Sequence, residues 1–337
     1  WNKTTLYGAF ENLLDEIKDD ERFRPDLVVY IGGHIVSKKL KSYLRSLKGV
    51  EQIRISQEAD IEDTFMHLTK VMDLPNSDAM SWLDNFGWHN QWEDYRKLWM
   101  DALAKSYERK ENFKPEFSSL ATVKEFFSQL QKVEPQDFKA FTLGGKDAQD
   151  DGIYDRKFDT FLPGMMSSVF SGNSSAIRLM NLYADRHVYC NRGVNGIEGS
   201  LSTAVGFSMC KNKSDKHVYC VLGDLSFFYD QNALWNRNLN GKLRIIVLNN
   251  GGGAIFGKFQ GLKESQAREE MIMAKHHATA EGICSQNEVK YLAAHTMEEM
   301  EQGISQLIHA ESERPMLLEV FTDMDVDNEM LEAIQKC

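Results

Sequence analysis

The sequence predicts an α/β protein with two doubly wound domains whose sheets are largely parallel. Three observations indicate this architecture: short β-branched runs alternate with segments of helical spacing, the runs end in glycine or polar residues, and 337 residues suit two domains of ordinary size. We place a Rossmann-like domain at residues 1–132 and a second domain at residues 167–337. Residues 133–166 have Pro, Gly and Asp clusters without a sustained period, which indicates a linker or surface insertion.

The first domain is expected to contain a strand, a helix and a second strand in succession. The run "DLVVYIGG" (26–33) is rich in β-branched residues and closes with glycines. It is followed by "SKKLKSYLRSL", which has helical spacing, and then by the short run "EQIRIS" (51–56). This order is typical of a parallel α/β unit, and residues 61–114 are predicted to be helical.

The second domain is expected to repeat a strand, a polar or Gly-rich loop and a helix. Four segments have this pattern: "SSVFSGNSSAIRLMNLY", "HVYCNRGVNGIEGSLSTAVGFSMC", "KHVYCVLGDLSFFYDQNALWNRNL" and "RIIVLNNGGGAIF". An amphipathic helix, "TMEEMEQGISQLIHA", and a last strand, "PMLLEVFT", follow. Such alternation predicts a doubly wound parallel sheet.

Composition excludes several classes of function. The formal net charge is −11 and the acidic residues are spread along the chain, so we expect no nucleic-acid partner. No apolar run approaches the roughly 20 residues of a membrane span, so we expect no stable membrane anchor. The five cysteines are widely spaced and form no CxxC, which favours reduced thiols in a cytoplasmic protein. The chain begins with Trp1, and we interpret it as a fragment.

Polar residues follow two of the predicted strands, at the point where each strand ends. Asp224 follows "YCVL", and Asn249 and Asn250 follow "IIVL". If these strands are neighbours, both loops project into one crevice. A carboxylate, an amide carbonyl and a loop carbonyl are hard oxygen ligands that suit Mg²⁺ bound to substrate phosphates. The glycines after Asn250 allow the backbone to lie close to a ligand, so we prefer this interpretation to an ordinary helix start and polar turn.

These motifs resemble a known enzyme family. "GDLS…YDQNAL…NNGGGAIF" is similar to the metal and diphosphate motif of thiamine-diphosphate-dependent enzymes. Most of that superfamily has glycine after the acid, whereas this chain has Leu225 and Ser226. With "GNSSAIR" and "NRGVNGIEGSLSTAVG", it resembles the 2-succinyl-5-enolpyruvyl-6-hydroxy-3-cyclohexene-1-carboxylate synthases of menaquinone biosynthesis, and "GGHIVSKKL" resembles their middle domain more weakly. The resemblance implies a middle domain followed by a diphosphate-binding domain, with residues 133–166 unmatched.

The resemblance implies a set of cofactor residues. Asp224, Asn250 and the carbonyl of Gly252 would hold Mg²⁺, with Mn²⁺ as an alternative, against the diphosphate of thiamine diphosphate. Gly223, Leu225 and Ser226 would shape the phosphate pocket, helped by backbone N–H groups at the helix start. Ile197 matches the apolar residue that bends the cofactor, although an isoleucine in this loop could also serve packing. Asn173 lies beside the substrate residues.

The resemblance also implies residues for two polycarboxylate substrates, 2-oxoglutarate and isochorismate. Ser174, Arg178 and Arg192 match the substrate side, where a guanidinium binds a carboxylate through two hydrogen bonds. Lys38 and Lys39 match a basic pair facing the second substrate, and the family often has arginine in the second place. From the residues alone, Arg178 is better explained as a solvated helix residue, and the two lysines are equally consistent with solvated side chains. Ile255 and Phe256 match an apolar wall over the reacting carbon.

The implied reaction decarboxylates 2-oxoglutarate and adds the succinyl-semialdehyde carbanion to isochorismate. The family's activating glutamate comes from an N-terminal pyrimidine-binding domain, which we expect to lie outside this chain, and its active site lies between two subunits of a homodimer or homotetramer. We therefore expect the fragment alone to be inactive. No metal-ligand spacing occurs among the nine histidines, and we assign no role to His276 or His277.

Three alternatives stay open. The chain could be part of another thiamine-diphosphate enzyme, such as a relative of acetolactate synthase, although the arginines and the Leu225–Ser226 pair favour the menaquinone branch. It could also be a non-catalytic cofactor-binding module, which the retained Asp224 and Asn250 disfavour. A nicotinamide-binding Rossmann domain ranks last because no GxGxxG motif is present.

Overall fold

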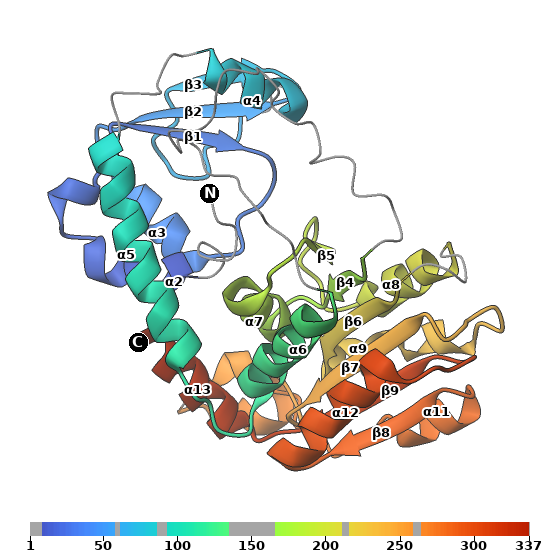
Figure 1. The fold of residues 1–337 in the computed structure, drawn as a ribbon. Coiled ribbons are helices and arrows are strands. Elements are labelled where there is room, and N and C mark those ends of the chain that lie inside the picture. Colours follow the sequence, from blue (N-terminus) through green and yellow to red (C-terminus); the bar gives the residue numbers. More distant parts are fainter. Residues whose placement is uncertain are drawn as a thin grey trace. The chain divides into compact units, whose positions relative to one another are not determined.

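The computed structural model describes residues 9–57, 61–85, 93–134, 166–210, 216–258 and 264–336 (Figure 1). The chain forms two compact units, an N-terminal unit that extends to Phe113 and a C-terminal unit from Lys114 to Ile334. We predicted the boundary after residue 132, whereas the helix before it belongs to the C-terminal unit. Of the predicted insertion, residues 135–165 lie outside the described ranges.

The N-terminal unit contains a three-stranded parallel sheet in the order β1-β2-β3. Its strands are β1 (Leu27–Ile31), β2 (Glu51–Ser56) and β3 (Lys70–Asp73), and its helices are α2 (Ala9–Ile17), η1 (Glu21–Phe23), α3 (Lys38–Ser46), α4 (Asn76–Asp84) and α5 (Glu93–Asn112). The Ser37 side chain caps α3 by accepting a hydrogen bond from Leu40 N at 2.9 Å. The predicted strands and helix are therefore confirmed.

One strand of this unit was missed. We predicted helices throughout residues 61–114, but β3 precedes α4 and α5. The four residues of β3 are too short to show a strand period, and pairing with Ile53 to Ser56 of β2 holds them extended. Ile53, Ile55 and Ala79 form the centre of the core beneath the sheet, and Trp82 packs against them.

The C-terminal unit is built on a six-stranded parallel sheet in the order β5-β4-β6-β7-β9-β8. The strands are β4 (Ser168–Ser171), β5 (Val188–Cys190), β6 (Val218–Gly223), β7 (Leu243–Asn249), β8 (Lys290–Ala294) and β9 (Met316–Phe321). The chain runs from β4 outward to β5 and then returns to β6 on the other side of β4. This reversal is the switch point at which doubly wound sheets bind ligands.

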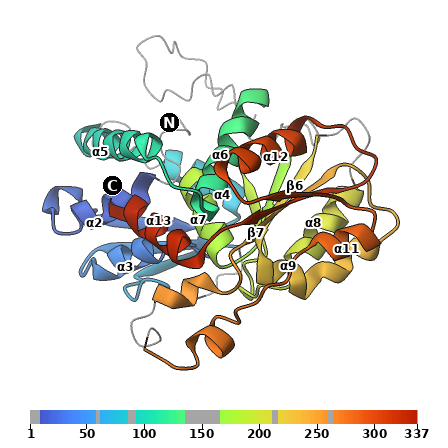
Figure 2. The ribbon, with the colours of Figure 1, turned by 90° about the horizontal axis from the view of Figure 1, so that it is seen from below.

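Helices cover both faces of this sheet. Figure 2 shows α6 (Ser119–Val133) and α12 (Met297–His309) on one side of β6 and β7, and α8 (Ser200–Met209), α9 (Asp224–Asp230) and α11 (Glu281–Gln286) on the other. The remaining helical elements are α7 (Ser175–Tyr183), α13 (Met324–Lys336), η3 (Gln231–Trp235), η4 (Ala254–Lys258) and η5 (Arg268–Ile272). The predicted doubly wound parallel fold is confirmed. Strand β8 and helices α11 and α13 were not predicted.

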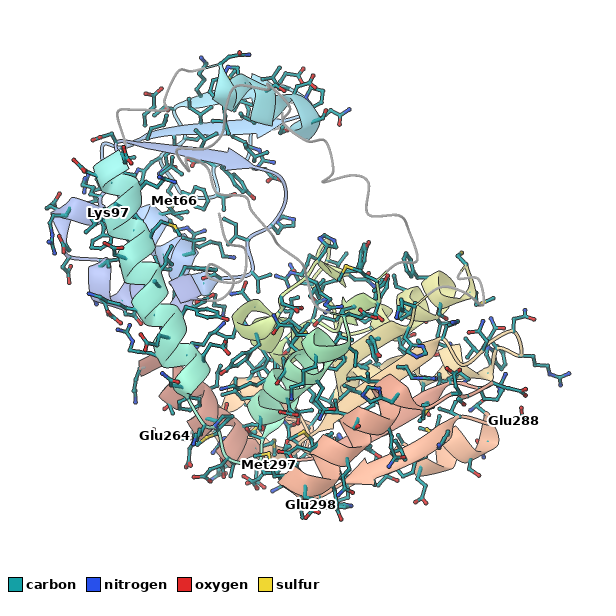
Figure 3. All side chains as sticks on the ribbon, viewed as in Figure 1. Met66, Lys97, Glu264, Glu288, Met297 and Glu298 are labelled. Carbon is teal, nitrogen blue, oxygen red and sulfur yellow. The ribbon has the colours of Figure 1, made fainter. Side chains whose placement is uncertain are left out.

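Figure 3 shows the side chains that fill the space between the sheet and its helices. Met297 and Glu298, labelled in that view, lie at the start of α12. Strands β6 and β7 are buried on both faces, as expected of central strands in a parallel sheet. On one face, Leu222, Val247 and Phe227 of α9 belong to a single large cluster. On the other face, the ring of Tyr219 packs edge-on against Phe126 of α6. Within the described ranges, no helix is both long and apolar enough to cross a membrane.

A buried arginine joins β7 to the end of α12. Arg244 is fully buried, and its Nε and Nη2 donate to the carbonyls of Leu307 and Ala310 at 3.1 and 2.9 Å. These carbonyls belong to the last turn of α12, where a cation also complements the helix dipole. Burial, together with the charge of Arg244 and two lysines, lowers the pKa of the neighbouring His217 to about 4.

We expect His217 to make the free energy of unfolding depend on pH. Its imidazole binds a proton near pH 6.5 in the unfolded chain but only near pH 4 in the folded protein, so stability falls as the pH is lowered through this window. His217→Gln should flatten that part of the curve. Urea unfolding of the wild type and of His217→Gln at a series of pH values tests this. If the free energy of unfolding changes with pH equally in both proteins between pH 6.5 and 4, the prediction is contradicted.

Candidate functional site

Strands β6 and β7 are adjacent and parallel, with Gly223 paired with Leu248. The expectation that the two loops share one edge of the sheet is therefore confirmed. Asp224 is the first residue of α9 and is 3% exposed. Its Oδ2 accepts a hydrogen bond from Gly252 N at 2.8 Å, and its Oδ1 accepts one from Leu225 N at 2.6 Å. The structure thus brings Asp224 and the glycine run after β7 into direct contact.

Gly252 has a backbone conformation that disfavours other residues. Its φ is 153°, and a Cβ atom at this position would lie 2.6 Å from the carbonyl oxygen of Met273. The next residue, Gly253, donates its N–H to the same oxygen at 2.6 Å, and His276 N donates to Gly251 O at 2.9 Å. Glycine therefore lets the loop after β7 pack against residues 273–276.

The two asparagines after β7 have different environments. Asn249 is buried at the end of the strand, where its Nδ2 donates to Glu319 Oε1 at 2.7 Å and to Ala278 O at 3.0 Å. Glu319, in β9, is fully buried and also accepts from Ala280 N and the Tyr291 hydroxyl. Asn249 therefore anchors the fold rather than facing a ligand.

Asn250 is placed differently. Its Nδ2 donates to Asp327 Oδ2 at 2.8 Å, whereas its Oδ1 is buried and has no hydrogen-bond partner among the described residues. A buried carbonyl oxygen without a donor is uncommon, because leaving it unpaired costs about 1–3 kcal/mol. The atom is therefore a candidate ligand for a cation.

One residue at this site was missed by the sequence interpretation. His276 Nε2 lies 3.2 Å from Asp224 Oδ2, and the interaction with this carboxylate raises the pKa of the imidazole. We had assigned no role to His276, because its neighbour is another histidine and no ligand spacing is present. His276 lies in the segment between η5 and α11, which no local signal in the sequence could have placed against Asp224.

The donor atoms at this edge suit a hard divalent cation. Asp224 contributes a carboxylate, Asn250 an unpaired amide oxygen and Gly252 a backbone carbonyl, the ligand types that Mg²⁺ prefers. No group of three His, Cys, Asp or Glu side chains arranged for a metal occurs within the described residues. The predicted set is of a different kind, because only Asp224 belongs to those residue types and the other two ligands are an amide oxygen and a backbone carbonyl.

A second group of predicted residues follows β4 and β5. Asn173 is 2% exposed and uses its whole amide within the protein. Its Nδ2 donates to the carbonyls of Asn191 and Gly196 at 2.8 and 2.5 Å, and its Oδ1 accepts from Arg192 Nη1 at 2.7 Å and from Cys190 Sγ at 3.4 Å. An amide has two N–H donors and two acceptor lone pairs, so none remains for a ligand. Asn173 orients Arg192 and the loop after β5.

The other predicted residues of this group lie in or beside the loops that follow β4 and β5. Ser174 precedes α7 with φ 67° and ψ −122°, a strained conformation for a non-glycine residue that is typical of functional sites. Arg178 in α7 is half-buried. Arg192 is also half-buried, and its Nε lacks a hydrogen-bond partner among the described residues. Ile197 is half-buried in the loop before α8.

The remaining predicted residues are placed as follows. Gly223 ends β6, Leu225 is half-buried and Ser226 is buried in α9. Ile255 and Phe256 lie in η4, and Phe256 is 41% exposed. Lys38 and Lys39 belong to the N-terminal unit, where they open α3 and the Lys39 ammonium pairs with Asp15 at 2.5 Å. Their predicted roles toward a second substrate stay predictions.

A cleft of about 370 Å³ lies beside Asn250, between the ends of β7 and β9 and the segment that includes η5. Its walls carry charges of both signs. The basic side chains are Arg268, Lys275, His276 and His277, and the acidic ones are Glu269, Asp323 and Asp325.

We expect Gly252→Ala to lower the free energy of unfolding by about 1–3 kcal/mol, because a strained backbone conformation and a contact with the Met273 carbonyl must both be accommodated. Gly206→Ala is the matched control. Gly206 lies exposed in α8 with open space around it, so alanine there should raise stability by about 0.5–1 kcal/mol. Chemical denaturation compares the two, and equal effects would contradict the strain at Gly252.

Comparisons with known proteins address the cofactor. The family "Thiamine pyrophosphate enzyme, C-terminal TPP binding domain" matches residues 171–320. This range includes Asp224, Asn250 and Gly252. The predicted thiamine-diphosphate-binding fold of the C-terminal unit is therefore confirmed.

Curated relatives extend the match to nearly the whole chain. The 2-succinyl-5-enolpyruvyl-6-hydroxy-3-cyclohexene-1-carboxylate synthase of Phocaeicola vulgatus is 33% identical over 322 residues, 92% of this chain and 49% of the relative. The synthases of Christiangramia forsetii and Desulfotalea psychrophila are 33% and 31% identical, over 97% and 89% of this chain and 51% and 48% of theirs. The chain spans about half the length of the curated relatives it matches.

Proposed function

We propose that this chain, which belongs to the family of thiamine-diphosphate-dependent 2-succinyl-5-enolpyruvyl-6-hydroxy-3-cyclohexene-1-carboxylate synthases of menaquinone biosynthesis, forms the part of such an enzyme that holds the diphosphate of the cofactor through Mg²⁺. The substrates would be 2-oxoglutarate, which is decarboxylated, and isochorismate, to which the remaining four-carbon unit is added.

The observation that carries this proposal is the edge formed by β6 and β7. Asp224 is buried against the glycine loop, and Asn250 keeps an unpaired buried oxygen. With the carbonyl of Gly252, these residues would hold the cation that bridges the diphosphate. Gly223, Leu225 and Ser226, at the end of β6 and the start of α9, would line the phosphate pocket.

The cofactor supplies, when bound, the electron sink for loss of CO₂ from a 2-oxo acid. The protein's own groups would bind and orient the substrates. Arg192, held in place by Asn173, and Arg178 would bind substrate carboxylates, which a guanidinium recognises through paired hydrogen bonds. Ile255 and Phe256 would exclude water from the reacting carbon, and Ile197 would pack against the cofactor.

We expect the complete protein to release CO₂ from 2-oxoglutarate only when Mg²⁺, thiamine diphosphate and isochorismate are all present. Asp224→Ala should lower turnover at least about 100-fold, because even groups that merely orient metal ligands change affinity by about 10–100-fold. Glu313→Ala, which removes an exposed acid before β9, is the control and should leave turnover unchanged.

The outcomes of that experiment separate the alternatives. Consumption of pyruvate in place of 2-oxoglutarate would keep the cofactor site and overturn the substrate assignment, in favour of an acetolactate-synthase-like enzyme. No turnover with any 2-oxo acid by the folded protein would favour a non-catalytic cofactor-binding module.

We expect this chain in isolation to release no CO₂ under the same conditions. None of its residues is assigned to activate the aminopyrimidine of the cofactor, and the chain spans about half the length of its relatives. The isolated chain and the complete protein are compared at equal concentration, after circular dichroism has established that the chain is folded. Turnover by the isolated chain would contradict the assignment.

A further inference from the structure

Asp327 lies near the start of α13 and gathers hydrogen bonds from three parts of the C-terminal unit. Its Oδ1 accepts from Ser119 N at 2.6 Å, at the start of α6. Its Oδ2 accepts from Ser119 Oγ at 2.7 Å, from Thr322 Oγ1 at 3.0 Å and from Asn250 Nδ2 at 2.8 Å. The carboxylate therefore connects α6, the end of β9 and the loop after β7. Neither the motifs nor the family resemblance assigned it a role.

The contact with Asn250 settles which way that amide faces. The oxygen and nitrogen of an asparagine amide are similar in shape, so its orientation follows from the groups around it. Asp327 Oδ2 accepts hydrogen bonds from the hydroxyls of Ser119 and Thr322, and an oxygen that acts as an acceptor selects the NH₂ group of Asn250. The amide oxygen is then turned away from Asp327, where it is buried and without a hydrogen-bond donor among the described residues. With the opposite orientation, the amide oxygen of Asn250 would face the carboxylate of Asp327, so that two acceptors would meet. The N–H groups of Asn250, which repel a cation, would then face the candidate metal site.

We propose that Asp327 is a positioning residue, which selects the orientation of the Asn250 amide and so presents its Oδ1 to the divalent cation of the cofactor site. This inference rests on the proposed function, because it assumes that a cation binds at Asn250. Outer-shell partners of this kind orient metal ligands, and their loss typically weakens metal affinity by about 10–100-fold.

The variant Asp327→Asn tests the orientation itself while keeping the side chain's shape. The backbone N–H of Ser119 can only donate, so it requires the oxygen of the new amide in the place of Oδ1. The new NH₂ group then takes the place of Oδ2. The hydroxyls of Ser119 and Thr322 can accept from it, because hydroxyls both donate and accept. The NH₂ group of Asn250 can only donate, so it cannot pair with the new NH₂ group. The Asn250 amide must therefore rotate, and its nitrogen then faces the cation.

Cation affinity of the complete protein is measured by calorimetric titration of Mg²⁺ at saturating thiamine diphosphate, which requires no turnover. We expect Asp327→Asn to raise the dissociation constant for Mg²⁺ at least tenfold, with little change in the midpoint of thermal unfolding. Ser119→Ala is the matched control. It removes one donor to the same carboxylate but leaves the contact with Asn250, so it should leave the dissociation constant within twofold.

A reciprocal exchange makes the test independent of the stability of the single variant. In the double variant Asp327→Asn with Asn250→Asp, the new amide donates to the new carboxylate, whose second oxygen faces the cation. We expect this protein to bind Mg²⁺ more tightly than either single variant, so that the two changes are strongly non-additive. If Asp327→Asn fails to fold, the double variant and Asn250→Asp decide the question.

Three results would count against the inference, and they are distinguishable. If Asp327→Asn binds Mg²⁺ as the wild type does, the positioning role is overturned and the proposed function stands. Additive effects in the double variant would also overturn it. If the wild-type protein shows no Mg²⁺-dependent binding of thiamine diphosphate, the proposed function falls and this inference falls with it.

Discussion

The parallel pairing of β6 with β7 is the constraint on which the candidate site depends. Both strands end at the same edge of the sheet, so the first residue after β6 and the loop after β7 meet there. The two faces of these strands pack against different partners, Phe227 of α9 on one face and Phe126 of α6 on the other, and a shift of one residue would exchange the side chains on the two faces. The hydrogen bond between Asp224 and Gly252 follows from this register, and so does the position of the unpaired oxygen of Asn250.

Buried charged side chains then tie the surrounding layers to this pair of strands. Arg244 of β7 holds the last carbonyls of α12, and Glu319 of β9 holds Asn249 and the backbone of Ala280. Such groups are costly to bury, and they remain in the interior because each is enclosed by several hydrogen bonds. The edge that carries the site is thereby supported from the neighbouring strand and from the helix layer.

The parts of the fold that could be predicted from sequence are those with strong local signals. The runs that became β6 and β7 are apolar, β-branched and closed by glycine or asparagine, and the convergence of Asp224 with the glycine loop followed from them. Strands β3 and β8 are short and half-buried, and they exist because neighbouring strands hold them extended. The boundary before α6 was misplaced because packing against the C-terminal sheet, rather than chain composition, decides where that helix belongs.

The candidate site could likewise be predicted only where residue types and their spacing along the chain indicate it. Residue types and spacing pointed to Asp224, Asn250 and Gly252, but the contacts of His276 and Asp327 join segments separated by 52 and 77 positions (276 − 224 and 327 − 250). No pattern in the chain encodes such contacts, since they arise only when loops from different strands pack together. Asn173 was predicted among the cofactor residues, beside the substrate residues. In the structure its hydrogen bonds are all made within the protein.

Those bonds of Asn173 have a consequence for the entropy of recognition. A long, freely rotating arginine loses on the order of 2 kcal/mol of rotamer entropy when it is immobilised on a ligand. Arg192 is already held by Asn173, and the same amide fixes the loop that carries it. Most of that ordering is therefore completed when the chain folds, and a carboxylate that reaches Arg192 meets a preorganised partner.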